Sequence, residues 1–177
     1  HVLSLSWLTV RSARHEYFVS KVPRSYSYGN REHDVVYYAN YFSAQLLAMC
    51  DSINEQLGTN FNACFLNRYD NRHQHLGWHA DDFEDMREDQ PIAVVSYGAE
   101  REIWFREKQK RGKVDDDERQ LLGNGSLWVM PVGYQDTHFH RIPKHDRPCS
   151  WRASLTFRSF HAPRVEAIPS SEVRLKL

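Results

Sequence analysis

The spacing of apolar residues predicts one helix near the start of the chain. Within residues 43–58, apolar side chains recur at helical intervals, at Leu46, Leu47, Cys50, Ile53 and Leu57. Ser43 stands where an N-cap belongs, and Gly58 stands where a helix ends in a left-handed residue. The pattern therefore defines both ends of the helix and the face that it buries.

Short apolar runs bounded by turn residues predict strands over most of the remaining chain. Two strands are expected before the helix, at 17–19 and 35–38. Five are expected after it, at 63–69, 92–97, 103–105, 125–130 and 151–157. The polar run over 108–118 between them is expected to be a solvated loop. Many short strands with one helix are typical of a sandwich or barrel, so we expect an α+β fold that is mainly β.

Two residues that are two positions apart, His79 and Asp81, form the first candidate site. Residues at this spacing on a strand face the same way, so both can bind one metal ion. One more histidine downstream would complete a 2-His-1-carboxylate set, which leaves about half of an octahedral iron(II) shell open for a co-substrate and O₂. His138, His140 and His145 compete for that third position.

The stretch 152–158 alternates between apolar and polar residues. One face carries only polar residues, namely Arg152, Ser154, Thr156 and Arg158. Such a face normally meets solvent, but arginine also binds carboxylates through two parallel N–H groups. Two arginines that flank a serine and a threonine therefore make a site for a dicarboxylate. Asn67 and Tyr69 have the same period of two and can donate hydrogen bonds to the same molecule.

Composition narrows the class of protein. The chain has 177 residues, of which 41% are hydrophobic, so one packed domain is expected. Lys and Arg number 23 and so do Asp and Glu, so a polyanion must be met by a local patch rather than by overall charge. The three cysteines are far apart, as is typical of free thiols in a reducing, intracellular compartment. No apolar run approaches the roughly 18 residues of a membrane span, so no membrane partner is expected.

These residues occur in an order that resembles the AlkB family of iron(II)- and 2-oxoglutarate-dependent dioxygenases. The shared motifs lie between about Pro23 and Phe160 and include Asn67-Arg68-Tyr69, His79-Ala80-Asp81, Ser96-Tyr97-Gly98-Ala99, Thr137 to Pro143 and Arg152 to Arg158. The resemblance implies a single domain over 1–177. It implies a nucleotide-recognition lid over about 1–42, and a helix plus a double-stranded β-helix (jelly-roll) core over about 43–160.

The resemblance also implies the cofactors and the residues that bind them. Fe(II) is expected on His79, Asp81 and His140, and O₂ is a co-substrate. The co-substrate 2-oxoglutarate is expected against Arg152, with Asn67, Tyr69, Ser154 and Arg158 nearby. Proteins of this family oxidise N-alkyl groups on nucleobases of DNA or RNA and release formaldehyde, succinate and CO₂. The pattern is most similar to the branch that repairs duplex DNA.

Candidate substrate contacts come from the expected lid and from loops. They are Tyr17, Phe18, Arg24, Tyr37, Phe83, Glu84, Arg106 and Lys113. Aromatic side chains are the usual receivers of a base that leaves its stack, although packing within the lid is an equal interpretation for the lid aromatics. The basic segment 105–113 resembles a loop that contacts phosphates in the duplex branch. Where the family commonly has an acid, this chain has Phe83, which alters base selectivity unless Asp82 or Glu84 substitutes.

Three other functions fit part of the pattern. An oxygenase of the same fold can act on a modified RNA base or on a protein side chain. A non-catalytic nucleic-acid-binding module with this fold would have no use for the His/Asp/His set. A zinc hydrolase uses such a set but leaves Arg152 and Arg158 without a role. We therefore expect an intracellular monomer, nuclear or cytoplasmic, that acts on methylated nucleic acid.

Overall fold

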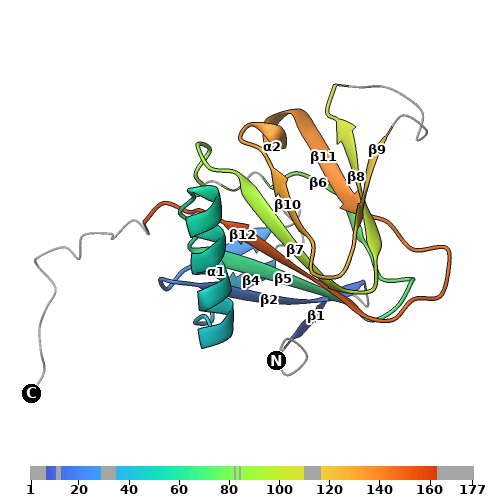
Figure 1. The fold of residues 1–177 in the computed structure, drawn as a ribbon, viewed down its shortest axis with the longest axis horizontal. Coiled ribbons are helices and arrows are strands. Elements are labelled where there is room, and N and C mark those ends of the chain that lie inside the picture. The colour runs from blue at the N-terminus through green and yellow to red at the C-terminus, as the bar shows by residue number, and fades with distance from the viewer. Residues whose placement is uncertain are drawn as a thin grey trace, which may run out of the picture.

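The computed structural model describes residues 7–10, 13–28, 35–81, 83, 85–109 and 117–162. Figure 1 shows the elements in chain order: β1 (Leu8–Val10), β2 (Arg14–Ser20), β3 (Ser25–Tyr28), β4 (Val35–Tyr38), α1 (Ala44–Leu57), β5 (Ala63–Tyr69), β6 (Leu76–His79), β7 (Ile92–Gly98), β8 (Arg101–Glu107), β9 (Glu118–Leu122), β10 (Leu127–Met130), α2 (Tyr134–Thr137), β11 (His138–Ile142) and β12 (Arg152–Arg158).

Two antiparallel sheets form the body of the molecule. The larger sheet has the strand order β1-β2-β5-β12-β7-β10, and the smaller sheet has the order β6-β11-β8-β9. Helix α1 crosses the strands of the larger sheet (Figure 1). The strand content and the two antiparallel sheets confirm the expected fold, which is mainly β with a jelly-roll core and one supporting helix. Within the described residues, no helix combines the length and apolarity needed to cross a membrane.

Strand β12 lies in the middle of the larger sheet and decides which residues reach the site. It pairs with β5 on one side and β7 on the other, and all seven of its residues are buried. Its apolar residues Ala153, Leu155 and Phe157 pack with α1. The predicted alternation is confirmed, but its polar face meets the protein interior rather than solvent.

Helix α1 begins and ends at the residues that the sequence predicts. The Ser43 hydroxyl accepts a hydrogen bond from the Leu46 backbone N–H at 3.3 Å. Gly58, with φ 64°, ends the helix in the left-handed region, which glycine adopts without steric cost. The buried stripe is narrower than predicted, because it contains Leu46, Cys50 and Ile53 but leaves Leu47 and Leu57 37% and 38% exposed.

A second apolar cluster joins the two sheets beside the site. It contains Tyr69, Ile92, Val94, Ile103, Phe105, Leu122, Met130 and Ile142. The cluster draws on β5, β7, β8, β9 and β10 and on β11, which carries one of the candidate metal ligands. Packing between the sheets therefore fixes the distance between the strands that carry the site.

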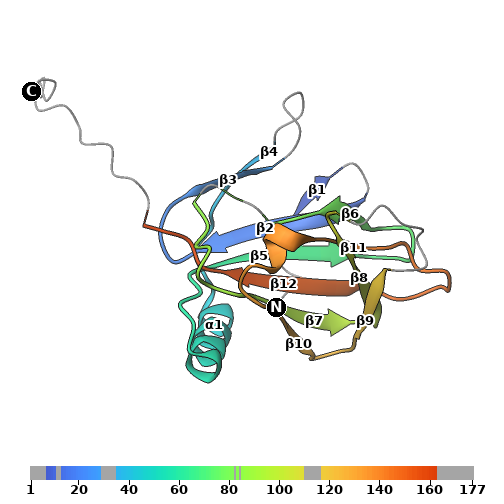
Figure 2. The ribbon, with the colours of Figure 1, turned by 90° about the horizontal axis from the view of Figure 1, so that it is seen from above.

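The N-terminal segment is divided between the larger sheet and a separate pair of strands. Strand β2 pairs with β5 over six residues, so residues 14–20 of the expected lid belong to the larger sheet. Strands β3 and β4 pair only with each other and are drawn above β2 in Figure 2, and β4 packs on β5 through Tyr37 and Phe65, whose ring centroids lie 5.2 Å apart. The predicted strands at 17–19 and 35–38 are present.

Five strands lie outside the predicted apolar runs, at 8–10, 25–28, 76–79, 118–122 and 138–142. Polar or glycine residues interrupt most of these segments, as in the sequence ERQLL of β9 and HFHRI of β11. Their apolar runs are too short to mark a strand, and cross-strand pairing stabilises them instead. Part of the run that was expected to be a solvated loop, at Glu118, therefore belongs to β9.

Truncating Leu46 should destabilise the protein far more than truncating its neighbour Leu47. Leu46→Ala removes a buried side chain between α1 and the sheet and should lower the free energy of unfolding by about 2–5 kcal/mol. Leu47→Ala, on the same helix and with the same change in chemistry, should cost about 0.5 kcal/mol. Urea unfolding followed by circular dichroism measures both. Equal losses would contradict the observed orientation of α1.

Candidate iron and 2-oxoglutarate site

Three potential metal ligands meet where β6 and β11 pair. His79 ends β6 and lies directly opposite His140 on β11, with ring centroids 4.1 Å apart. Asp81 Oδ1 lies 3.7 Å from His79 Nε2. One ligand atom from each residue lies within 4.8 Å of the other two. Among the downstream histidines, the structure brings His140 to this cluster.

The route by which Asp81 reaches the cluster differs from the prediction. The spacing of His79 and Asp81 predicts that both lie on one strand and face the same way. In the structure β6 ends at His79, and Asp81 lies in the following loop. The Asp81 backbone N–H donates to Gln135 Oε1 at 2.8 Å, which fixes the loop beside β11. Gln135 was not predicted, because nothing in its local sequence marks it.

Both histidines are in the form that binds a metal. His79 Nδ1 lies 2.9 Å from the Gly77 carbonyl oxygen, so Nδ1 carries the proton and Nε2 is free to bind an ion. Burial lowers the pKa of His79 and, with the neighbouring His79 ring, lowers the pKa of His140 to about 3. Both imidazoles are therefore neutral at pH 7.

Asp81 is held as a carboxylate by Arg158. Arg158 Nε and Nη2 donate to Asp81 Oδ2 at 3.1 and 2.6 Å. Burial alone would raise the pKa of Asp81, but Arg158 and the two histidines lower it to about 2. Arg158 is expected beside 2-oxoglutarate; in the structure its guanidinium lies on the candidate metal ligand Asp81, in the same cavity as Arg152. This contact occupies Oδ2 and leaves Oδ1 on the side of His79.

Arg152 is a buried cation with unused donors. Its side chain is 0% exposed, and only Nε is paired, to Ser96 Oγ at 2.9 Å. Among the described residues, neither Nη1 nor Nη2 has a hydrogen-bond partner, nor does the nearby Tyr69 hydroxyl. Burial lowers the pKa of Arg152 to about 10, so it remains charged at neutral pH. Burying such donors unpaired is costly, and a bound carboxylate would remove that cost.

Strand register brings the other predicted residues to the same place. Tyr69 pairs with Arg152, and Asn67 pairs with Ser154, across β5 and β12. Asn67 Oδ1 accepts from Arg14 Nε at 3.1 Å, so the Asn67 amide group is left to donate. One cavity between the sheets is lined by Asn67, Tyr69, Leu76, His79, Asp81, Val94, Ile103, Met130, His140, Ile142, Arg152, Ser154, Thr156 and Arg158. The residues present thus fit both an iron ion and a dicarboxylate.

Comparison with known proteins agrees with this geometry. Residues 4–158 match the family model described as the 2OG-Fe(II) oxygenase superfamily. The chain belongs to this superfamily. Its cofactors are therefore Fe(II), with 2-oxoglutarate and O₂ as co-substrates.

Individual relatives confirm the resemblance to AlkB proteins. Mouse DNA oxidative demethylase ALKBH2 is 37% identical over 112 residues, covering 61% of this chain and 47% of the mouse protein. The RNA-directed RNA polymerase of Lolium latent virus is 32% identical over 148 residues, which cover 80% of this chain and 7% of that protein. The solved structure of OsALKBH1 shares the fold, with a TM-score of 0.57, 16% identity and coverage of 86% of this chain and 83% of its own. The chain spans less than half the length of the curated relatives it matches here.

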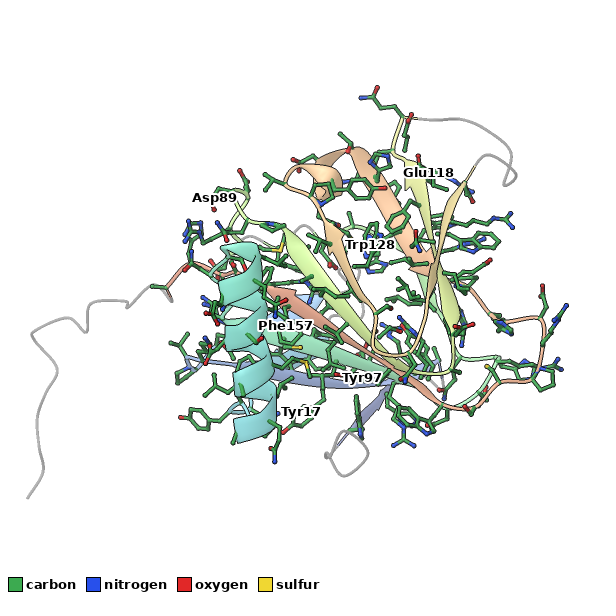
Figure 3. All side chains as sticks on the ribbon, viewed as in Figure 1. Tyr17, Asp89, Tyr97, Glu118, Trp128 and Phe157 are labelled. Atoms are coloured by element: carbon green, nitrogen blue, oxygen red, sulfur yellow. The ribbon has the colours of Figure 1, made fainter. Side chains whose placement is uncertain are left out.

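Four of the predicted substrate residues lie outside the cavity that contains the three clustered ligands. Phe18 and Tyr37 are 2% and 5% exposed and pack in one apolar cluster, which favours the packing interpretation for them. Tyr17 lies with Phe157 on the side of the larger sheet that α1 covers (Figure 3). The smaller sheet, where Glu118 is labelled, lies on the other side of the larger sheet. Arg24 donates to the His161 carbonyl oxygen at 2.6 Å.

Phe83 lies next to the metal cluster. It lines a cavity of about 210 Å³ together with Asp81 and Met86, and the Arg158 guanidinium carbon lies 5.7 Å from its ring centroid. Arg106 forms an ion pair with Asp117, with Nε to Oδ1 at 2.9 Å. The remaining predicted positions Glu84 and Lys113, and the alternative Asp82, lie outside the described residues.

Replacing any of the three clustered ligands should abolish metal binding. His79→Ala, His140→Ala and Asp81→Asn should each lose tight Co(II) binding, measured by calorimetry with Co(II) as a stand-in for iron. His138→Ala is the matched control, because its ring stacks on Tyr134 at 4.2 Å and lies outside the cavity. Loss of binding in the His138 variant with binding retained in the His140 variant would reverse the assignment.

Proposed function

We propose that this chain is an Fe(II)- and 2-oxoglutarate-dependent dioxygenase that removes alkyl groups oxidatively from nucleobases in DNA or RNA. In this proposal His79, Asp81 and His140 hold the iron. Arg152 binds the distal carboxylate of 2-oxoglutarate, with Asn67, Tyr69 and Ser154 around it. The observation that carries the proposal is the unpaired, buried guanidinium of Arg152 in the same cavity as the three metal ligands.

The chain's own residues position the reactants and exclude water. When bound, iron with 2-oxoglutarate and O₂ supplies the oxidation of an N-methyl group, whose hydroxymethyl product breaks down to formaldehyde and the restored base. Arg158 keeps Asp81 ionised and turns Oδ1 toward the histidines. The apolar side chains of Leu76, Val94, Ile103, Met130 and Ile142 line the rest of the cavity, which strengthens the Arg152–carboxylate attraction.

Nucleic acid is the substrate class that the relatives support. The ALKBH2 relatives are named DNA oxidative demethylases, which favours alkylated DNA. RNA is a second candidate, because the matched viral protein is an RNA-directed RNA polymerase. The family commonly has an acidic residue at the position of Phe83. In this proposal the Phe83 ring therefore gives the base site an apolar wall at that point. Three free cysteines are consistent with an intracellular enzyme, and its monomeric state stays a prediction.

Turnover of methylated oligonucleotides tests the proposal directly. The protein should convert 2-oxoglutarate to succinate and release formaldehyde only with Fe(II) and a methylated strand. DNA and RNA oligonucleotides carrying 1-methyladenine or 3-methylcytosine, single or paired, should be compared by mass spectrometry. Repair replaces a methyl group with hydrogen, so each repaired lesion should lower the mass of the oligonucleotide by roughly 14 Da. Succinate formation without repair of any strand would overturn the choice of substrate.

Arg152→Ala should raise the KM for 2-oxoglutarate. Truncating one partner of a buried charged pair costs about 2–5 kcal/mol, which is a rise of roughly thirtyfold or more. Co(II) binding should survive, because Arg152 contacts none of the three ligands in the hydrogen bonds observed. Arg147→Ala, at an exposed arginine, is the control and should behave as wild type. A wild-type KM in the Arg152 variant would contradict this placement of the co-substrate.

A further inference from the structure

Arginines and tryptophans alternate across the smaller sheet. The Arg106 guanidinium carbon lies 4.6 Å from the Trp78 ring centroid, and that of Arg141 lies 4.7 Å from Trp78 and 4.3 Å from Trp104. Arg119 lies 4.1 Å from Trp104. These five residues come from all four strands of the sheet. We call them the Arg–Trp row.

The Arg–Trp row occupies the face of the smaller sheet opposite the iron site. Strand register pairs Arg141 with Trp104 and Trp104 with Arg119. Successive residues of a strand point to opposite faces, so Arg141 points away from its neighbour His140, which lines the cavity. Arg119 is exposed, and the other four members are partly exposed. The row is therefore accessible to a macromolecule.

The cations of the row are only partly neutralised. Asp117 pairs with Arg106 through two hydrogen bonds, at 2.9 and 3.1 Å. Among the described residues, Arg119 and Arg141 take part in no ion pair, and the buried Nε of Arg141 has no hydrogen-bond partner. Burial lowers the pKa of Arg141; Asp117 opposes this, and repulsion from Arg106 and Arg119 adds to the lowering. The like charges lie close enough to repel one another, and a bound polyanion would relieve that repulsion.

Among the described residues, neighbouring charges on the same face do not cancel this excess. Lys108 lies 5.1 Å from the Phe139 ring centroid and extends the basic surface. Glu102 accepts a hydrogen bond from Trp104 Nε1 at 2.8 Å. It lies two residues before Trp104 on β8 and is therefore on the same face as the row. The other acids of these strands lie on the opposite face of the sheet from the row. Glu107 pairs with His138, and Glu118 pairs with Phe105.

The stacking leaves the guanidinium groups suited to phosphate. A ring covers the flat face of a guanidinium, whereas its N–H donors lie in the plane and stay free at the edge. Stacking also restricts the arginine rotamers before any ligand binds, so less entropy is lost on binding. Planar, pre-oriented donors match the paired oxygens of a phosphodiester.

The Arg–Trp row is connected to the iron site across the edge of the sheet. Strand β6 is an edge strand, and Trp78 directly precedes the candidate ligand His79 on it. The His79 side chain is 29% exposed, whereas His140 is buried. A strand whose base lies at His79 therefore passes over the β6 edge before it meets Trp78 and Arg106.

We propose that the Arg–Trp row binds the phosphate backbone of the nucleic-acid substrate, beyond the nucleotide that is repaired. This inference rests on the proposed function, because it assigns the surface to the same substrate. The row supplies affinity without reading sequence, and it makes the enzyme prefer long strands to short ones.

Binding of an unmodified single strand tests the row without reference to turnover. Arg119→Gln with Arg141→Gln removes two phosphate contacts. The log–log salt dependence of binding to a 20-nucleotide strand, measured by fluorescence anisotropy, should fall by about 1.4 in slope, at about 0.7 for each contact. Lys21→Gln with Arg68→Gln removes two cations outside the smaller sheet and should leave the slope unchanged. The single variant Arg119→Gln, at the exposed end of the row, should lower the slope by about 0.7 if the double variant fails to fold.

Strand length separates this inference from the proposed function. A methylated nucleoside 5′-monophosphate has no phosphate beyond the nucleotide that is repaired, so the double variant should repair it at the wild-type rate while losing efficiency on the 20-nucleotide strand. Equal losses on both lengths, or an unchanged salt slope, would overturn the inference and make the row structural. Tighter binding of an acidic peptide than of the strand would also overturn it. Failure of all repair with the slope change intact would overturn the proposed function but not the row.

Discussion

The buried ion pair between Arg158 and Asp81 connects the two sheets at the candidate metal site. Arg158 ends β12, the central strand of the larger sheet, and Asp81 follows β6, an edge strand of the smaller sheet. Both side chains are almost fully buried, so neither charge is stable there without the other. The pair therefore fixes where the loop after β6 lies, and with it the position of the carboxylate relative to His79 and His140.

A second buried polar chain supports the co-substrate end of the same cavity. Arg14 donates to Asn67 and forms an ion pair with Glu16, and the Tyr37 hydroxyl donates to Glu16. These contacts connect Tyr37 on β4 to the side-chain amide of Asn67, which faces the cavity. The aromatic residues of the expected lid thus contribute through packing and hydrogen bonding in this structure, rather than by lining the cavity.

The smaller sheet serves two purposes because its residues alternate between faces. On β11, His140 points toward the cavity and Arg141 points away from it, and β6 ends with Trp78 and His79. The inner face meets the apolar cluster between the sheets, so it is fixed by packing. The outer face holds cations against aromatic rings, which orders them without neutralising them.

The sequence by itself determined the features that depend on local periodicity. The caps of α1, part of its buried face, the alternation of β12 and the candidate metal set all follow from spacing or from recognisable motifs. Each of these features depends on residues within a few positions of one another, or on the order in which the motifs of a known family occur along the sequence.

Only the tertiary structure decided which predicted residue meets which. Arg152 and Arg158 share one face of one strand, yet Arg158 meets Asp81 while Arg152 keeps its unpaired donors. Gln135 reaches the Asp81 backbone, and the Arg–Trp row requires the order β6-β11-β8-β9. Periodicity assigns a side chain to a face of its own strand, but long-range pairing and burial select the neighbours across that face, and no local spacing encodes them.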